Sequence, residues 1–295
     1  MAYAFDLADL DTAAAVRRIA AEELTEALAE LDDSKIPEAE LVHGLRKHVK
    51  KIRGLIRLVR PNFPGYEVEN AALRDAARGI SGLRDAEVLR ATLERIAAKA
   101  PPEAEAALDH LRAALASHQE GTRAGGGTEA LAAFRVAVQG ALLRVPDWKL
   151  RGKALNLLED GLATTWEKAR KRQRQALRDP SSETIHEWRK RVKDHWYQAR
   201  LLSPIWPEMM GPHADTADAI GEWLGEHHDI AVFVDRLQAE PLSGADRDTL
   251  TALARNRQEK LEKKAHEAAT RLFAGTDRAL LDRWGSWWKV WQDGR

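Results

Sequence analysis

The sequence predicts an all-α protein made of two similar helical halves. Alanine, leucine, glutamate and arginine are abundant in its 295 residues, and apolar residues recur three and four positions apart. That spacing places apolar side chains on one face of a helix. A basic phrase occurs twice, as VHGLRKHVKKIRGLIRLVRP at 42–61 and as IHEWRKRVKDHWYQARLLSP at 185–204, and a glycine-rich stretch, GTRAGGGTEA, lies near the middle of the chain at 121–130. We therefore expect one domain of two repeats, about 1–120 and about 131–295, joined by residues 121–130.

Ten helices are expected, and several of them carry start or stop signals. Pro101 and Pro102 open one helix, and Ser181 opens another, because these residue types suit the first helical positions. Prolines at 61, 64, 204 and 207 end the two basic helices at equivalent places. Only residues 2–6 suggest an extended segment. The expected helices span residues 11–31, 38–60, 67–99, 101–120, 128–144, 148–178, 181–203, 212–239, 244–273 and 276–292.

The composition excludes several classes of protein. Cysteine is absent, so the chain has no disulfide, no thiolate nucleophile and no cysteine-based zinc site. No window approaches the ~18 uncharged apolar residues of a membrane-spanning helix. The N-terminus, MAYAFDLADLD, lacks the basic start and apolar run of a signal peptide. These features predict a cytoplasmic globular protein without a membrane partner.

The charges are segregated although they balance. Lys plus Arg and Asp plus Glu both number 46. Residues 1–41 hold eleven acids against three basic residues, whereas residues 42–61 hold seven Lys or Arg and no acid. Residues 166–200 hold eleven Lys or Arg against five acids. A local positive field on a neutral body suits a specific polyanion.

The two basic segments match more closely than chance allows. At an offset of 143 residues, eight of their twenty positions are identical. A second match follows at an offset of 144, between SGLRDAEVLRATL (81–93) and GEHHDIAVFVDRL (225–237), in which Arg84 aligns with His228 and Asp85 with Asp229. Six pairs carry Lys, Arg or His in both copies, namely His43/His186, Arg46/Arg189, Lys47/Lys190, His48/Arg191, Lys50/Lys193 and Arg57/Arg200.

Helical geometry places the repeated cations on one surface. At 100° per residue, the apolar residues from Val42 to Val59 form a stripe for burial, and the cations from His43 to Arg57 fall on an adjacent arc. Side chains beside a buried stripe lie at the edge of a helix–helix groove. The alternative is an ordinary solvated helix face, but such faces intersperse acids with cations, and the first copy has none.

The pattern H-x-x-R-K-x-x-K, at 43–50 and again at 186–193, resembles the CHAD family, the conserved histidine α-helical domain. GLRDAEV and GEHHDIAV resemble the family's second element, and WEKARKRQRQALRDP resembles its basic lead-in, with Trp166 at the aromatic position. The resemblance implies two pseudo-symmetric antiparallel four-helix bundles around a basic channel that binds inorganic polyphosphate. The chain departs from the family at His228, where arginine is usual, and at Glu187–Trp188, where the first copy has Gly44–Leu45.

Polyphosphate suits such a channel because it is a flexible chain of repeated anions without bases. Arginine offers bidentate contacts to phosphate oxygens, lysine offers point charges, and histidine offers donors that strengthen on protonation. The expected polyphosphate-binding residues are His43, Arg46, Lys47, Lys50, Arg53, Arg57, Arg84, Arg170, Arg174, His186, Arg189, Lys190, Lys193, Arg200 and His228.

Two further signals have structural interpretations. The run His227–Asp229 resembles the His-Asp doublet of metal-dependent phosphohydrolases, but the aligned first copy has Arg84, which cannot ligate a metal. We expect Asp85 and Asp229 to orient neighbouring basic side chains instead. The tryptophans at 284, 287, 288 and 291 share one helical face, which indicates a buried C-terminal helix, with a homodimer interface as the alternative.

The sequence thus predicts a protein that binds polyphosphate without being an enzyme, in the cytoplasm and associated with polyphosphate granules. No nucleophile–base pair, carboxylate pair or metal set emerges, so we expect no catalytic residue, no metal and no cofactor. Nucleic acid is not expected, because exposed aromatics are not interleaved with the cations. The alternatives that stay open are a metal-dependent polyphosphate or triphosphate hydrolase and an RNA- or DNA-binding helical protein.

Overall fold

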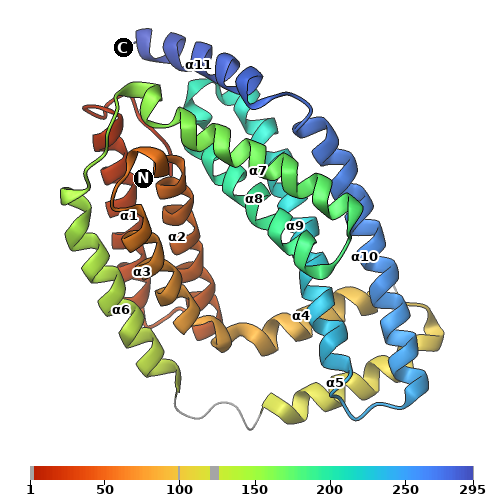
Figure 1. Cartoon of the computed structure of the whole chain (residues 1–295). Coiled ribbons are helices and arrows are strands. Elements are labelled where there is room, and N and C mark those ends of the chain that lie inside the picture. The colour runs from red at the N-terminus through yellow and green to blue at the C-terminus, as the bar shows by residue number, and fades with distance from the viewer. Residues whose placement is uncertain (1–2, 99, 120–125, 295) are drawn as a thin grey trace.

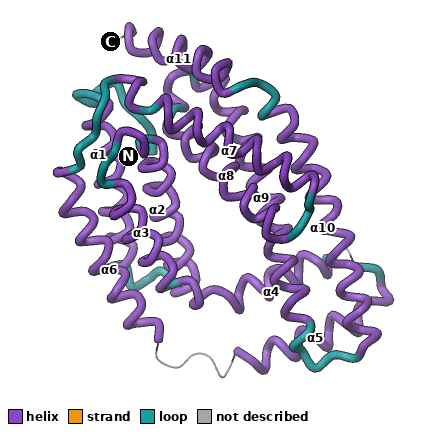
Figure 2. Tube along the Cα trace, viewed as in Figure 1, coloured by secondary structure: helices purple, strands orange, loops and turns teal. Residues whose placement is uncertain are grey.

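A computed structural model of the chain describes residues 3–98, 100–119 and 126–294, apart from the side chains of 83–87, 116–119 and 126. All regular structure within the described residues is helical, which confirms the predicted all-α class (Figure 1, Figure 2). None of these helices combines the length and the apolar composition needed to cross a membrane. The α-helices are α1 (Thr12–Asp32), α2 (Glu38–Leu58), α3 (Tyr66–Gly79), α4 (Asp85–Ala97), α5 (Glu105–Gln119), α6 (Gly126–Arg144), α7 (Glu159–Arg178), α8 (Ser182–Leu201), α9 (Pro207–Leu237), α10 (Gly244–Leu272) and α11 (Asp277–Asp293).

The helix boundaries follow local signals. Ser181 caps α8, because its hydroxyl accepts a hydrogen bond from the backbone N–H of Thr184 at 3.3 Å. Both basic helices end just before a proline-containing 3₁₀ turn, α2 at Leu58 and α8 at Leu201. The prolines therefore stop the two helices where the sequence predicted.

Three predicted elements differ from the structure. The helix predicted over 67–99 is divided by a 3₁₀ turn at Ser81–Arg84, because Gly79 and Gly82 weaken the helix there. The helix predicted to begin at 148 begins at Glu159, after Gly152 and Ala154 adopt positive φ angles of 104° and 48°. Residues 3–6 form no strand, although the backbone N–H of Phe5 donates to the Leu201 carbonyl at 3.0 Å.

Two hydrophobic cores hold the described helices together. The larger one extends from α1, α2, α3 and α6 to α7, α8, α11 and the first part of α9. The smaller one is built by α4 and α5 with the last turns of α9 and the first part of α10, and it includes Leu93, Leu108, Phe233 and Leu250. Helices from the two halves of the chain therefore share the smaller core, as their positions at the bottom of Figure 1 show.

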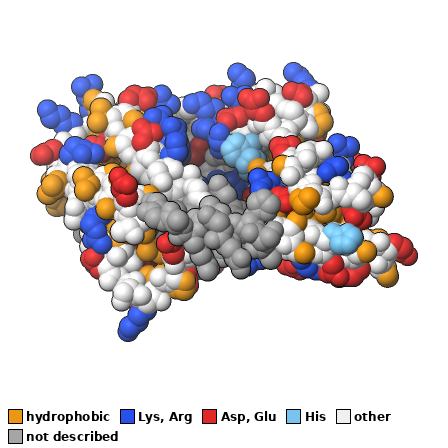
Figure 3. All heavy atoms as spheres, turned by 90° about the horizontal axis from the view of Figure 1, so that it is seen from below, with side chains coloured by type: hydrophobic (Ala, Val, Ile, Leu, Met, Phe, Trp, Pro, Cys, Tyr) orange, Lys and Arg blue, Asp and Glu red, His pale blue; other side chains and the backbone are white. Residues whose placement is uncertain are grey.

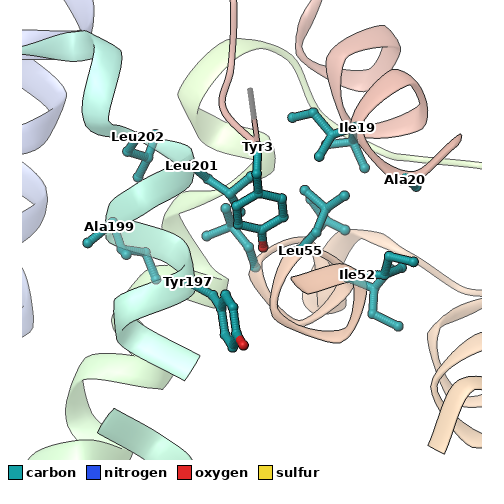
Figure 4. Close-up of a cluster of buried hydrophobic side chains, with 14 of the residues drawn as sticks. Tyr3, Ile19, Ala20, Ile52, Leu55, Tyr197, Ala199, Leu201 and Leu202 are labelled. Carbon is teal, nitrogen blue, oxygen red and sulfur yellow. The ribbon is translucent and has the colours of Figure 1, made fainter. Parts of the chain in front are cut away.

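The two basic helices meet at their C-terminal ends. A Cβ atom at Gly54 would lie only 2.7 Å from the Cβ of Tyr197, so α2 and α8 touch there through a glycine. Tyr3 packs against the same contact, with its ring 6.1 Å from that of Tyr197 and its hydroxyl donating to the Lys51 carbonyl at 2.7 Å (Figure 4). From this junction α2 and α8 diverge toward their N-terminal ends (Figure 1).

Candidate functional site

The cations of α2 lie beside its buried stripe, as helical geometry predicted. Val42, Leu45, Val49, Ile52, Ile56 and Val59 are all buried. Arg46 and Arg53 extend toward α3, where Arg46 Nη1 donates to the Ala77 carbonyl at 2.7 Å and Arg53 Nε donates to Asn70 Oδ1 at 3.0 Å. His43, Lys47 and Lys50 are exposed. The helix thus presents one row of cations that brace its neighbour and a second row at the surface.

The contact between Gly54 and Tyr197 fixes which faces of α2 and α8 are opposed. His43, Lys47 and Lys50 precede Gly54 at helical spacings of four, three and four residues, so all four positions share one face. His186, Lys190 and Lys193 precede Tyr197 at the same spacings on α8. The six positions therefore lie on the helix faces that contain the Gly54–Tyr197 contact. We call these six residues the facing set.

Figure 3 shows a hollow between the two halves of the molecule, seen from below. Lys, Arg and His side chains gather around it. The view is consistent with facing basic surfaces on α2 and α8, because these are the helices that diverge on that side.

Acidic residues of α9 compensate the cations of α8. Lys193 Nζ lies 2.9 Å from Asp218 Oδ1 and 3.1 Å from Glu222 Oε1, and it lies over the Trp196 ring at 3.6 Å. Arg189 Nε donates to the Gly221 carbonyl at 3.2 Å. These partners were missed from the sequence, because they come from another helix, α9, whose packing against α8 helical phase does not predict. The only signal for them was the i, i+4 spacing of the two acids on α9.

Two histidines on α8 and α9 form a stacked pair. The rings of His186 and His228 lie 4.1 Å apart at 33°. Burial, followed by the proximity of His228, lowers the pKa of His186 to about 4, and burial also lowers the pKa of His228. Both imidazoles are therefore neutral near pH 7, and His186 adds donor capacity rather than charge to the facing set.

A buried ion pair closes the junction between α2 and α8. Arg57 Nη1 lies 2.6 Å from Asp194 Oδ1, and Arg191 Nη1 lies 2.9 Å from Asp194 Oδ2. Asp194 aligns with Lys51 of the first copy. The repeated phrase therefore has an acid in one copy where the other has a base, and this difference was the signal in the sequence for the contact. Arg57 thus bridges the two halves, a role that the sequence analysis did not give it.

The junction also gathers basic residues, of which the sequence analysis had not selected Arg60, Lys168 and Arg191. Burial, followed by the positive charges of Arg60 and Arg191, lowers the pKa of Lys168. Burial and then the charge of Arg57 lower the pKa of Arg53 to about 10. Several cations therefore lie near Asp194 at this junction.

The remaining residues predicted to bind polyphosphate lie in other surroundings. Arg200 lies over the Tyr3 and Trp196 rings at 5.7 and 5.1 Å. Arg170 is half-buried and Arg174 is exposed on α7. The side chain of Arg84 lies outside the described residues, as does that of Asp85. Asp229 accepts a hydrogen bond from Arg95 Nη2 at 3.4 Å, so a basic neighbour is present as predicted.

The structure also places the run His227–Asp229 and the tryptophans of α11. His227 is buried, and its Nε2 lies 4.0 Å from Glu262, but the run His227–Asp229 is not among the groups of described residues that lie close enough together to hold a metal. On α11, Trp284 and Trp288 are buried, and Trp288 contacts Phe5 at a ring distance of 5.7 Å. The interpretation of α11 as a packed helix is therefore confirmed, and the homodimer stays a prediction.

Comparison with known proteins decides the family. The sequence matches the family described as CHAD domain over residues 13–238, which is most of the chain. The chain belongs to the CHAD domain family. Among solved structures it is similar to PptA from Streptomyces chartreusis, with 15% identity, a TM-score of 0.62, and 90% of this chain and 100% of that one covered. It is also similar to the CHAD domain from the plant Ricinus communis, with 17% identity, a TM-score of 0.61, and 93% and 95% covered. At these identities the two structures support the CHAD fold alone. A search of curated proteins found no match.

Proposed function

We propose that this CHAD domain binds inorganic polyphosphate between α2 and α8. Polyphosphate binding is a known role of the family to which the chain belongs. The observation that carries the proposal for this chain is the facing set, which follows from the contact between Gly54 and Tyr197. Two rows of Lys and His at matching helical spacings suit a linear chain of repeated anions.

The first half supplies most of the available charge in this proposal. His43, Lys47 and Lys50 are exposed on α2, whereas Lys193 on α8 is held between Asp218 and Glu222. An incoming phosphate competes with those carboxylates for Lys193 but not for Lys47. We therefore assign the main contacts to α2 and weaker ones to Lys193, Arg189 and Lys190, since Lys190 is ion-paired with Glu187.

We propose binding without turnover. The basic faces of α2 and α8 hold no acid–base pair placed to activate water, and cleavage of a phosphoanhydride needs such a pair or a metal. Incubation of the protein with polyphosphate and Mg²⁺ or Mn²⁺ tests this directly. Sustained phosphate release that is lost on replacing residues of the facing set would instead favour the hydrolase.

The binding proposal is tested by reversing charge on α2. We expect Lys47→Glu combined with Lys50→Glu to weaken binding of defined-length polyphosphate by at least tenfold, because two attractive contacts become repulsive. Both side chains lie outside the buried stripe, so the helical circular dichroism signal should be kept. Isothermal titration calorimetry at two salt concentrations gives both the affinity and the number of cations involved.

A matched control removes the same charge elsewhere. Arg278→Glu combined with Lys289→Glu changes two exposed residues on α11, far along the chain from α2. This variant should keep nearly the wild-type affinity. Equal losses in the two variants would mean that net charge alone governs binding. Tighter binding of single-stranded RNA than of polyphosphate at equal charge would favour the nucleic-acid alternative.

A further inference from the structure

A buried histidine and three glutamates lie together between α1 and α2, on the side of α2 away from the facing set. His48 is 6% exposed, and its Nδ1 lies 2.6 Å from Glu23 Oε2. Glu26 Oε2 lies 4.0 Å from the same nitrogen. Because Glu23 and Glu26 are three residues apart on α1, both carboxylates point toward one imidazole nitrogen.

The second nitrogen of His48 has its own carboxylate. Glu30 Oε1 lies 3.1 Å from His48 Nε2, so Glu30 can hold the Nε2 proton while Nδ1 exchanges its own proton, shared with Glu23, for a cation. Lys51 Nζ binds the far oxygen of Glu23, Oε1, at 2.8 Å. An imidazole oriented by an outer carboxylate, with a ligating carboxylate held by a hydrogen bond, is the usual support of a metal site in proteins.

The distances and charges also suit a cation. Metal–ligand bonds of about 2.0–2.1 Å in a tetrahedral site place ligand atoms about 3.3 Å apart. The separations of 2.6 and 4.0 Å lie on either side of that value, and all three ligand atoms lie within 4.8 Å of one another. His48 lies at hydrogen-bond distance from a carboxylate at each ring nitrogen, which favours its protonated form. Once a cation displaces the Nδ1 proton, three carboxylates and Lys51 leave two negative charges, which a divalent cation would balance.

We propose that Glu23, Glu26 and the Nδ1 of His48 form a binding site for a divalent transition-metal ion, with Zn²⁺ as the best fit. One imidazole and two carboxylates suit Zn²⁺ or Mn²⁺, whereas Mg²⁺ prefers oxygen ligands and water. The ion would join α1 to α2, the helix that carries the first row of the facing set. It would stabilise the fold and takes no part in the proposed binding of polyphosphate.

The site is specific to the first half of the chain. The residue aligned with His48 in the second copy is Arg191, which cannot ligate a metal. Gly44 allows the carboxylate of Glu30 to approach α2, because a Cβ atom at this position would overlap that carboxylate. The second copy has Glu187 there. The chain therefore differs from its own repeat at two positions that this site needs.

Titration of the untagged protein with ZnCl₂ tests the proposal. We expect one Zn²⁺ per chain with a high affinity, weaker binding of Mn²⁺, and no competition from millimolar Mg²⁺. Glu26→Gln should weaken Zn²⁺ binding by more than tenfold, because a carboxylate ligand is lost while both hydrogen bonds of His48 are kept. Glu22→Gln, also on α1 and equal in charge change, should bind Zn²⁺ like the wild type.

Two results would overturn the site. One is the absence of stoichiometric Zn²⁺ binding, and the other is Zn²⁺ binding that is unchanged in Glu26→Gln, which would place the ion at other histidines. A thermal melt with and without Zn²⁺ gives an independent readout, since a bound ion should raise the Tm of the wild type but not of Glu26→Gln. Polyphosphate affinity should be the same in Glu26→Gln, so failure of this site and failure of the proposed function are distinguishable.

Discussion

Lys193 differs from Lys47 in the acids that surround its ammonium group. Asp218 and Glu222 lie 2.9 and 3.1 Å from Lys193 Nζ, and its aliphatic chain packs against Gly221. The two carboxylates hold the lysine in place and reduce the positive field of α8. They therefore set how much the second half can contribute to binding an anion.

Removing these two acids should strengthen polyphosphate binding. We expect Asp218→Asn combined with Glu222→Gln to tighten binding severalfold, because Lys193 is released and two repulsive charges are lost. The slope of log affinity against log salt should also become steeper, by roughly 0.7 for each cation gained. Calorimetry across a salt series measures both quantities. Asp215→Asn combined with Glu208→Gln, at exposed positions of α9, is the control, and an equal gain there would mean that only net charge matters.

The residues of the site divide into those that a single helix specifies and those that tertiary packing adds. The row from His43 to Lys50 could be predicted, because period and phase within one helix define it. Asp218 and Asp194 could not be assigned, because each acts on a cation of another element. Helical phase places side chains on a face, but it does not say which helix will cover that face.

At the scale of the elements, the prolines and the apolar period predicted α1, α2 and α8 closely. The break between α3 and α4 was missed because glycine lowers helix propensity by only ~1 kcal/mol, which packing can override in either direction. In the structure, the separate α4 lies on α9 and completes the smaller core. The benefit of that break lies in contacts with the other half of the chain, which the local sequence does not show.

The contact of α2 with α8 depends on Gly54. We expect Gly54→Ala to lower the free energy of unfolding by about 1–3 kcal/mol, because its Cβ would press on Tyr197 and on the nearby Tyr3 hydroxyl. Urea denaturation measures the loss. Gly211→Ala, where a Cβ meets no atom within 4 Å, should leave stability unchanged or raise it, since alanine favours the helix. Equal stability of Gly54→Ala and the wild type would show that the helices are free to separate.

At the scale of the whole molecule, buried histidines should make stability depend on pH. Burial lowers the pKa values of His186, His213 and His227 to about 4, and it also lowers those of His195, His228 and His266. In the unfolded chain these groups titrate near ~6.5, so the unfolded state binds more protons between about pH 6.5 and pH 4. The contribution of these six histidines to stability should therefore be fully present above ~6.5 and fall as the pH decreases through that window. His48 contributes in the opposite sense, because burial lowers its pKa but hydrogen bonds to Glu23 and Glu30 raise it overall.

Thermal melts at pH 7.5, 6.5, 5.5 and 4.5 would show this loss. We expect little change between the first two and a progressive decrease in Tm at the lower two. The double variant His195→Phe and His213→Phe removes two of the buried imidazoles, whose Nε2 atoms lie 2.7 Å apart. If it folds, its Tm should decrease less steeply with pH. A constant wild-type Tm down to pH 4.5 would contradict the assignment of neutral buried imidazoles.

Bound polyphosphate should raise the lowered pKa of His186 in the stacked pair His186–His228. A bound polyanion beside α8 favours the protonated form of His186, so its pKa rises in the complex and a proton is taken up on binding. Because that pKa begins at about 4, affinity should increase mainly as the pH falls from ~6.5 toward ~5, and little above pH 7. Calorimetry in two buffers of different ionisation enthalpy measures the proton uptake. His186→Gln combined with His228→Gln should flatten the pH dependence and keep most of the salt slope. If the full pH dependence persists in that variant, the proton is bound elsewhere, and the exposed His43 of the facing set becomes the group to replace next.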